Sequence, residues 1–373
     1  MSDTPQIPRG IEPLWSTYIH AKAAARGIPL SGNFELTPRC NFDCKMCYVH
    51  KQVEISREMT ARDWLLLGRQ AADAGMVFLL LTGGEPLMRK DFREIYTGLK
   101  KMGLLISINT NGALLDGDWV EFFRKDPPLR FNISLYGGCE ETYRRLCGHE
   151  GYARVTENIK ALKRVGLQVK INASITPENA SDIPAIYAFG AEQGIPVKAT
   201  AYMFPPARIN GGLYGDAPYR FTPEEAARHT LTCREQYLTP EQISRGATAD
   251  TADTDEECTD GQGERMQCRA GKTAFWITWD GRMLPCGMFP NEGYRLSEIP
   301  FAEAWERTKA DTAAITLPAA CKSCPHKDTC PACAAACLSE SGNPSVCPDY
   351  ICRMTRTLSR LTTEKYPKKE TTP

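Results

Sequence analysis

The feature that most constrains the fold is an alternation of strand-like and helix-like segments over the first 200 residues. Six apolar, β-rich runs occupy residues 33–37, 77–82, 105–109, 130–135, 167–173 and 197–202. Helical patterns fill the gaps, over residues 61–74, 92–102, 118–124, 152–165 and 183–193. Strands that alternate with helices pair in parallel. The sequence therefore predicts an α/β fold whose parallel sheet curls into a partial (β/α)6 TIM-like barrel, with reactive groups on the loops after the strands.

Cysteine content is the second constraint, because the 373 residues include 16 cysteines. Three of them, Cys40, Cys44 and Cys47, form a CxxxCxxC motif directly after the first predicted strand, and nine lie between residues 268 and 352. The opening residues, MSDTPQIPRG, show no charged-then-apolar signal segment, so a cytoplasmic location is predicted. In a reducing compartment, thiols at this density indicate metal or redox chemistry and not disulfides.

Charge and hydropathy exclude two classes of partner. The 45 Lys and Arg residues balance the 45 Asp and Glu residues, which leaves no excess of basic charge for nucleic acid or an anionic membrane. The longest apolar run, residues 76–81, is far shorter than the roughly 20 residues that cross a bilayer. We therefore expect neither nucleic-acid binding nor a membrane span.

The CxxxCxxC motif favours an iron–sulfur cluster. Three thiolates within eight residues can bind three irons of a 4Fe-4S cluster, which leaves the fourth iron open to another ligand. The alternatives are a single redox cysteine or a zinc site, but structural zinc normally takes four protein ligands and this loop offers three.

The segment ELTPRCNFDCKMCY at 35–48, which contains the three cysteines, resembles the cluster-binding motif of the radical S-adenosylmethionine (SAM) superfamily. The segment Thr82-Gly83-Gly84-Glu85-Pro86, at the end of the second strand, is similar to the GGE motif of that family. The resemblance implies that Cys40, Cys44 and Cys47 hold a SAM-binding 4Fe-4S cluster, and that Gly83, Gly84 and Glu85 receive the methionine ammonium of SAM. Small residues at this point would let the backbone approach the ligand closely.

Two further residues resemble polar SAM contacts of the same family. Asn111 follows the third predicted strand and Ser134 lies at the end of the fourth. The resemblance implies that they contact the ribose and carboxylate of SAM. The alternative for both is an ordinary polar residue of a loop.

The cysteine-rich tail resembles the SPASM extension, which carries auxiliary Fe-S clusters. Cys268, Gly281 and Cys286 have the spacing of its first half, and Cys321, Cys324 and Cys330 have that of its second half. The family pattern then expects a cysteine at position 334, where this chain has Ala334. A zinc ribbon is the alternative for such CxxC pairs.

The SPASM resemblance implies two auxiliary 4Fe-4S clusters. The first would be held by Cys268, Cys286 and Cys337, with Cys333 or Cys258 as the fourth ligand. The second would be held by Cys321, Cys324, Cys330 and Cys352, and Cys347 is a second candidate for the closing position.

The predicted organisation has five parts, with an N-terminal helical extension first. They are residues 1–30 (this extension), 31–238 (the barrel), 239–267 (a polar linker), 268–360 (the SPASM domain) and 361–373 (a polar tail). Asp280-Gly281 predicts a β-hairpin within the fourth part, and residues 301–313 read as a helix.

The resemblance implies a radical SAM/SPASM enzyme that cleaves SAM reductively to a 5′-deoxyadenosyl radical and oxidatively modifies a peptide. The leading prediction is a maturase of ribosomally made peptides that forms thioether or carbon–carbon crosslinks. Its expected partners are a peptide or protein substrate, a separate leader-recognition protein, and flavodoxin or ferredoxin as reductant.

Two alternatives remain open at this point. A sulfatase-type maturase that generates formylglycine commonly has Asp after the second SPASM cysteine, whereas this chain has Gly287. The other is a non-catalytic Fe-S electron carrier or zinc protein, which would have no use for a SAM amine receptor such as Glu85.

Overall fold

A computed structural model of the protein describes residues 11–48, 58–205, 219–246, 266, 268–289 and 293–367. Its centre is a nine-stranded sheet in the order β6-β5-β4-β3-β2-β1-β7-β8-β9. The first six strands pair in parallel and are β1 Ser31–Glu35, β2 Phe78–Thr82, β3 Leu105–Thr110, β4 Arg130–Ser134, β5 Val169–Ser174 and β6 Val197–Thr200. The sheet is not closed, since β6 and β9 are its edges. The predicted partial barrel is thereby confirmed.

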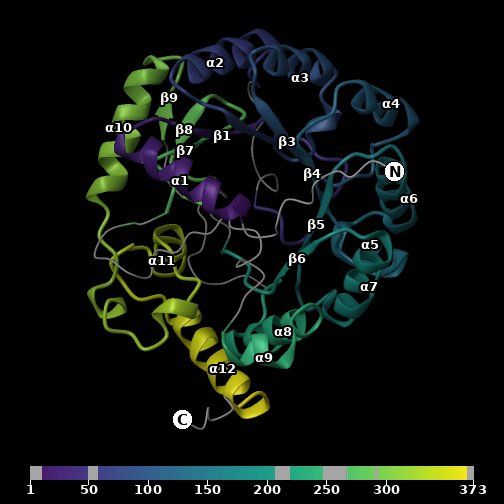
Figure 1. Cartoon of the computed structure of the whole chain (residues 1–373), viewed down its shortest axis with the longest axis vertical. Coiled ribbons are helices and arrows are strands. Elements are labelled where there is room, and N and C mark those ends of the chain that lie inside the picture. Colours follow the sequence, from purple (N-terminus) through teal and green to yellow (C-terminus); the bar gives the residue numbers. More distant parts are fainter. Residues whose placement is uncertain are drawn as a thin grey trace.

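Helices cover the convex side of this sheet (Figure 1). They are α2 Ala61–Asp73, α3 Phe92–Lys101, α4 Gly117–Lys125, α5 Glu140–Cys147, α6 Tyr152–Arg164 and α7 Ile183–Gln193. Alternate residues of the strands, such as Ile106 and Ile108 of β3, are fully buried against these helices. The helices lie within one residue of the predicted ranges, except α5, whose eight residues were not predicted.

The hairpin predicted at Asp280-Gly281 is confirmed and extends the same sheet. Strand β7 (Ala274–Ile277) pairs in parallel with β1, and β8 (Arg282–Leu284) and β9 (Tyr294–Arg295) follow antiparallel. Gly281 occupies the turn with φ of +81°, a conformation that favours glycine. One sheet thus runs across the predicted boundary between residues 267 and 268.

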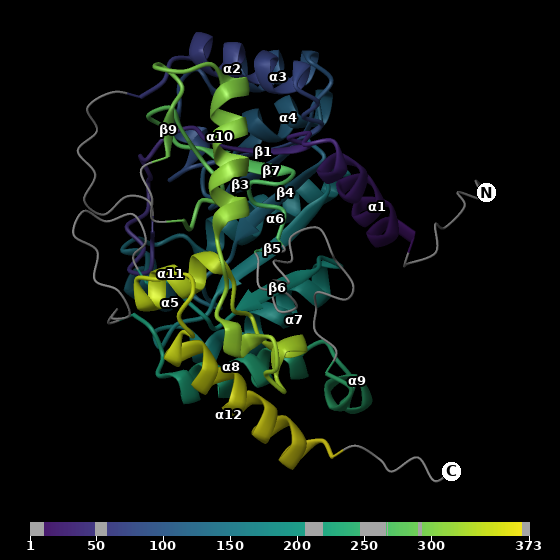
Figure 2. The same ribbon diagram turned by 90° about the vertical axis from the view of Figure 1, so that its left-hand side faces the viewer.

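Helix α1 (Ile11–Ala25) lies at the N-terminal ends of the strands and projects to the side in Figure 2. The ring of His20 stacks on Phe78 of β2, and its Nδ1 lies 2.8 Å from Thr273 Oγ1. The helix predicted near the N-terminus is therefore confirmed and is attached to the base of the barrel.

The remaining helices surround the open side of the sheet (Figure 1). They are α8 Pro223–Glu235, α9 Pro240–Ser244, α10 Phe301–Ala314, α11 Ala334–Ser341 and α12 Asp349–Lys365. Single 3-10 turns occupy Pro86–Met88, Ala180–Asp182, Ala319–Cys321 and Lys327–Thr329. None of the helices in the described ranges is long and apolar enough to cross a membrane.

Two predicted boundaries differ from the structure. The segment 239–267 was predicted to be a polar linker, but residues 240–244 form α9, because Thr239 and Gln242 make a capping box at its start. Cys258 and most of this segment lie outside the described residues. At the other end, α12 continues to Lys365, five residues into the predicted polar tail.

Candidate functional site

The three cysteines of CxxxCxxC lie on the loop after β1, where each is half-buried. Burial raises the pKa of the Cys40 thiol to about 12, and a hydrogen bond from the Phe42 amide partly opposes this rise. The negative charges of Glu85, Cys44 and Cys47 raise the Cys40 pKa further. These three groups are therefore close enough to Cys40 to act on its charge. The structure brings the predicted cluster thiols to one place.

The cysteine loop is held against helix α5. The backbone amide of Asp43 donates to the Cys147 carbonyl at 2.9 Å, and that of Lys45 donates to the Leu146 carbonyl at 3.0 Å. The Lys45 ammonium also contacts the Glu178 carboxylate at 2.5 Å. The short unpredicted helix α5 thus supports the loop that carries the motif.

Gly83 and Gly84 pack directly on the backbone of the cysteine loop. The Gly84 amide donates to the Thr37 carbonyl at 2.8 Å, and the Glu85 amide donates to the Arg39 carbonyl at 2.8 Å. A Cβ atom at Gly83 would lie 2.4 Å from the Thr37 carbonyl oxygen, and Gly83 has φ of +145°. Only glycine permits this close approach. This contact of the Gly83-Gly84 loop with the backbone of the cysteine loop is called the cradle.

The Glu85 carboxylate is fully buried and joins the ends of β2 and β3. Its Oε1 accepts from the Leu87 amide at 3.1 Å and from Thr110 Oγ1 at 2.9 Å, and its Oε2 accepts from the Asn111 amide at 2.8 Å. Burial raises the pKa of Glu85 to about 7, although these hydrogen bonds act in the opposite direction. In the described structure the carboxylate organises two strand ends, and its contact with SAM stays a prediction.

Asn111 connects the third strand end to the cysteine loop. Its Nδ2 donates to Asn41 Oδ1 at 2.7 Å and lies 3.7 Å from Cys40 Sγ, and its Oδ1 accepts from the Ala113 amide at 3.0 Å. The structure therefore places Asn111 beside Cys40, and its contact with SAM stays a prediction.

Ser134, at the end of β4, is half-buried, and its side chain acts to lower the pKa of the Tyr136 hydroxyl. Burial raises the pKa of Tyr136 well above its usual range, and the Cys44 thiolate adds to this. Direct contact of Ser134 with SAM stays a prediction.

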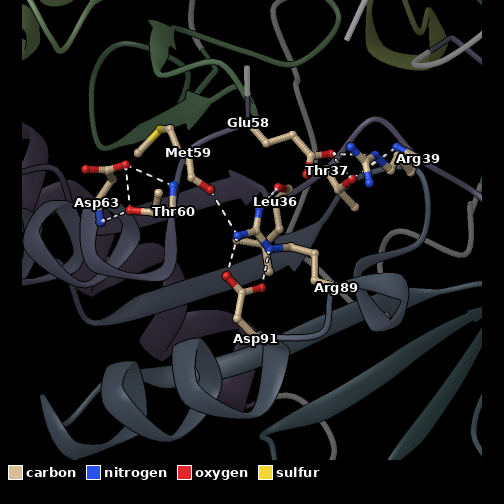
Figure 3. Close-up of polar contacts among 9 residues, drawn as sticks. All are labelled: Leu36, Thr37, Arg39, Glu58, Met59, Thr60, Asp63, Arg89 and Asp91. Carbon is tan, nitrogen blue, oxygen red and sulfur yellow. Dashed lines mark hydrogen bonds and ion pairs between the residues drawn. The ribbon is translucent and has the colours of Figure 1, made fainter. Parts of the chain in front are cut away.

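A buried arginine that the sequence did not single out binds two backbone carbonyls next to the cysteine loop (Figure 3). The Arg89 side chain is 7% exposed and pairs with Asp91. Its Nη1 donates to the Leu36 carbonyl at 2.8 Å and its Nη2 to the Met59 carbonyl at 3.0 Å. Arg89 therefore holds the residue after β1 and the residue before the N-cap of α2 at fixed positions. In sequence it looks like an ordinary charged residue of a turn.

Glu58 provides a second attachment in the same region (Figure 3). Its carboxylate accepts from Thr37 Oγ1 at 2.6 Å and lies 3.5 Å from Arg39 Nε. Both partners lie on the cysteine loop. This contact was also missed, because no pattern of spacing links residue 58 to residues 37 and 39.

Five tail cysteines gather in a second group. Cys321 Sγ lies 3.8 Å from Cys347 Sγ. Burial raises the pKa of Cys321 to about 12, and the hydrogen bond with Cys347 is the second-largest cause of this rise. Burial likewise raises the pKa of Cys352 to about 11, with charge contributions from Cys347, Cys330 and Cys324. The predicted set of Cys321, Cys324, Cys330 and Cys352 is thus brought together, and Cys347 joins it.

Cys333 and Cys337 lie at the start of α11 and are buried. Burial raises the pKa of Cys337, and the thiolates that add to this are Cys333, Cys321, Cys347 and Cys330. These neighbours all belong to the tail. Cys268 and Cys286 flank the hairpin β7–β8, so their predicted sharing of a cluster with Cys337 stays a prediction.

The spacing of the thiols differs from that around a single metal ion. Within the described ranges, no three His, Cys, Asp or Glu side chains converge closely enough to hold one ion. A Zn²⁺ site requires such convergence, whereas the thiolates of a 4Fe-4S cluster each bind a different iron.

Comparison with known proteins gives one family and several relatives. The model of the radical SAM superfamily matches residues 34–190. An AdoMet-dependent heme synthase of Methanosarcina barkeri is 25% identical over 325 residues, which cover 83% of this chain and 92% of the synthase. A probable GTP 3′,8-cyclase of Saccharolobus islandicus is 35% identical over 150 residues, 40% of this chain. The match spans only 48% of that cyclase.

Two solved structures share the fold along most of the chain. SuiB of Streptococcus suis bound to precursor peptide SuiA has a TM-score of 0.64 and 20% identity, and the match covers 94% of this chain and 82% of SuiB. The structure of anSMEcpe with bound AdoMet and Cp18Cys peptide has a TM-score of 0.70 and 17% identity. This match covers 91% of this chain and 98% of anSMEcpe. At these identities the likeness concerns the fold. The family match alone assigns a radical SAM domain to residues 34–190.

Proposed function

We propose that this protein is a radical SAM enzyme with auxiliary Fe-S clusters that oxidatively modifies a peptide substrate. The observation that carries the proposal is the cradle, in which the Gly83-Gly84 loop packs on the backbone of the loop that carries Cys40, Cys44 and Cys47. With SAM bound, a reduced cluster there would supply a 5′-deoxyadenosyl radical. The protein itself would supply three thiolates, a close backbone approach and a buried, hydrogen-bonded carboxylate.

The residues around the cradle have distinct tasks in this proposal. Cys40, Cys44 and Cys47 hold the cluster and leave one iron for SAM. Gly83 and Gly84 let the backbone lie against the cysteine loop, and the buried Glu85 fixes the positions of the two strand ends that border SAM. Radical chemistry of this kind depends on positioning and exclusion of water more than on acids or bases.

A peptide substrate is supported by two structural relatives. SuiB is bound to a precursor peptide and anSMEcpe to a Cp18Cys peptide, and this chain shares its fold with both. The cysteine-rich tail would hold auxiliary clusters that accept the second electron of an oxidation. In this proposal a flavodoxin or ferredoxin supplies the first electron, and a separate protein presents the leader.

A second candidate is a SAM-dependent step of heme synthesis. It is favoured by the match to the M. barkeri heme synthase, which covers 92% of that protein. Formylglycine generation, the alternative that the sequence leaves open, is less favoured, because Gly287 stands where that branch commonly has Asp.

The first experiment is anaerobic incubation of the reconstituted protein with SAM and dithionite. We expect 5′-deoxyadenosine, and none above background from the variant in which Cys40, Cys44 and Cys47 are all Ala. Absence of 5′-deoxyadenosine from the unmutated protein would refute the enzyme proposal. Added peptide or porphyrin substrates that raise its yield would then distinguish the candidates.

Iron content tests the auxiliary clusters separately. Three full 4Fe-4S clusters predict about twelve irons per chain, and about eight in the triple Ala variant. A content near four in the unmutated protein would contradict the auxiliary sites.

A further inference from the structure

A buried ion pair joins the barrel to the cysteine-rich tail. Arg220 precedes α8 and Glu340 lies on α11, and each side chain is only 3% exposed. Arg220 Nη2 donates to Glu340 Oε1 at 2.5 Å, and Nη1 lies 3.4 Å from Oε2. Tyr202, two residues after β6, donates its hydroxyl to the same Oε1 at 2.8 Å. Tyr202 and Arg220 therefore both bind a carboxylate more than a hundred positions further along the chain.

An aromatic ring of α12 completes the surroundings of this pair. The Arg220 guanidinium lies 4.0 Å from the ring centroid of Tyr350, and the Tyr350 hydroxyl donates to the Phe221 carbonyl at 2.8 Å. The ring centroids of Tyr202 and Tyr350 are 5.9 Å apart. The guanidinium is thus enclosed by the carboxylate and the tyrosine rings.

Such a buried pair contributes more to position than to net stability. Removing two charges from water offsets most of their attraction, but loss of one partner leaves an unpaired buried charge, which is strongly destabilising. An arrangement that tolerates little displacement therefore fixes α11 relative to the end of β6. By contrast, the exposed pair Arg353–Glu224 at 3.0 Å joins α12 to α8 and is screened by solvent.

The element that this pair fixes carries two cysteines of the tail. Cys333 is the N-cap of α11 and Cys337 lies in its first turn, and Glu340 follows Cys337 by three residues. Residues three and seven apart share one side of a helix. Burial and then the Glu340 charge raise the pKa of the Tyr202 hydroxyl, and the Cys333 thiolate adds to this. Cys333 therefore lies near the Tyr202 hydroxyl that binds Glu340, and Cys337 lies one turn before Glu340 on the same helix.

We propose that Arg220, Glu340 and Tyr202 form a positioning unit that holds Cys333 and Cys337 beside the end of β6 while keeping the net charge next to these thiolates near zero. The inference rests on the proposed function, because it takes the thiolates to hold an auxiliary Fe-S cluster. The potential of such a cluster responds to nearby charge and hydrogen bonding. A lone carboxylate would disfavour the added electron, and a lone guanidinium would favour it.

The experiment is a redox titration of the auxiliary clusters, followed by electron paramagnetic resonance, in the full-length reconstituted protein. Glu340→Gln leaves Arg220 unbalanced and raises the reduction potential. Arg220→Gln leaves Glu340 unbalanced and lowers it. The double variant returns the potential toward that of the unmutated protein. Glu224→Gln, which makes the same change of charge in the exposed pair, leaves the potential unchanged.

The outcomes separate this inference from the proposed function. An iron content near four in the unmutated protein would overturn both. An iron content near twelve, with potentials that stay constant or shift in the same direction in the two single variants, would overturn the inference alone. If the Arg220→Gln variant loses its auxiliary iron, two other variants carry the test. The inference then requires that Glu340→Gln raises the reduction potential and that Arg220→Lys leaves this potential unchanged.

Discussion

At the scale of single residues, the site depends on groups whose environment is unusual for their type. Gly83 adopts φ of +145° against the Thr37 carbonyl, and the carboxyl of Glu85 is fully buried beneath the cysteine loop. Both lie at the end of β2, between the two loops that form the cradle. Small changes at either position therefore act directly on the cradle.

Gly83→Ala is expected to abolish the cradle. Its Cβ would lie 2.4 Å from the Thr37 carbonyl oxygen, so the two loops must separate. We expect SAM affinity, measured by equilibrium dialysis on the reconstituted protein, to fall about tenfold or more, which corresponds to at least 1.4 kcal/mol. The matched control is Gly103→Ala, where φ is +84° but no atom lies within 4 Å of the added Cβ. Equal losses of affinity in the two variants would contradict this explanation.

Glu85 predicts a pH dependence of stability in the cluster-free protein. Its pKa rises from an ordinary 4.5 to about 7 in the folded state, so its contribution to stability is full below pH 4.5 and is lost as the pH rises through 7. Relative to Glu85→Gln, the unmutated protein should lose about 2–4 kcal/mol between pH 4.5 and 8. Urea unfolding at several pH values measures this difference. A difference between the two proteins that does not change with pH would exclude Glu85 as the titrating group.

At the scale of elements, the cysteine loop is fixed by contacts from three sides. Helix α5 holds it through the backbone of Asp43 and Lys45, the Gly83-Gly84 loop packs on it, and Arg89 holds its base. The spacing of CxxxCxxC predicted the ligands, but the supports come from segments with no recognisable pattern. Their identity depends on which backbone carbonyls the folded chain places near a buried guanidinium.

Arg89→Met tests the support at the base of the loop. The Leu36 and Met59 carbonyls would each lose a charged donor, so the free energy of unfolding should fall by about 2–4 kcal/mol. The iron content of the cluster at Cys40, Cys44 and Cys47 should fall as well. It is measured in a protein variant whose tail cysteines have been replaced. Arg124→Met, which removes an exposed pair with Glu121, is the control and should change neither quantity. Unchanged iron content in Arg89→Met would show that the base does not support the cluster.

At the scale of the whole molecule, barrel and tail share one sheet and one core. Strand β7 pairs with β1, so the hairpin that carries Cys286 at its end is an extension of the barrel. The side chain of Phe275 on β7 is fully buried. Its ring centroid lies 6.5 Å from that of Phe34 on β1 and 5.2 Å from that of Phe301 on α10. The two parts should therefore unfold together.

Phe275→Ala removes this shared ring. We expect one cooperative unfolding transition in both proteins, shifted in the variant by about 3–5 kcal/mol, as for other buried aromatic residues. Calorimetry on the cluster-free protein provides the measurement. The control is Leu66→Ala, whose side chain is 58% exposed and should leave the transition unchanged. Two transitions, only one of which shifts, would show that barrel and tail are independent.

The sequence by itself determined the six βα units, the CxxxCxxC motif and the glycines of the cradle, because each depends on local periodicity or on spacing within a few residues. Only the tertiary structure decided the addition of Cys347 to the tail group, the role of Arg89, and the meeting of Tyr202, Arg220 and Glu340. These residues are brought together by the curvature of the sheet and the return of the tail across its open side. These contacts join residues between 26 and 138 positions apart, and contacts over such separations leave no periodic trace in the sequence, since the physical reason for them is the shape of the folded chain.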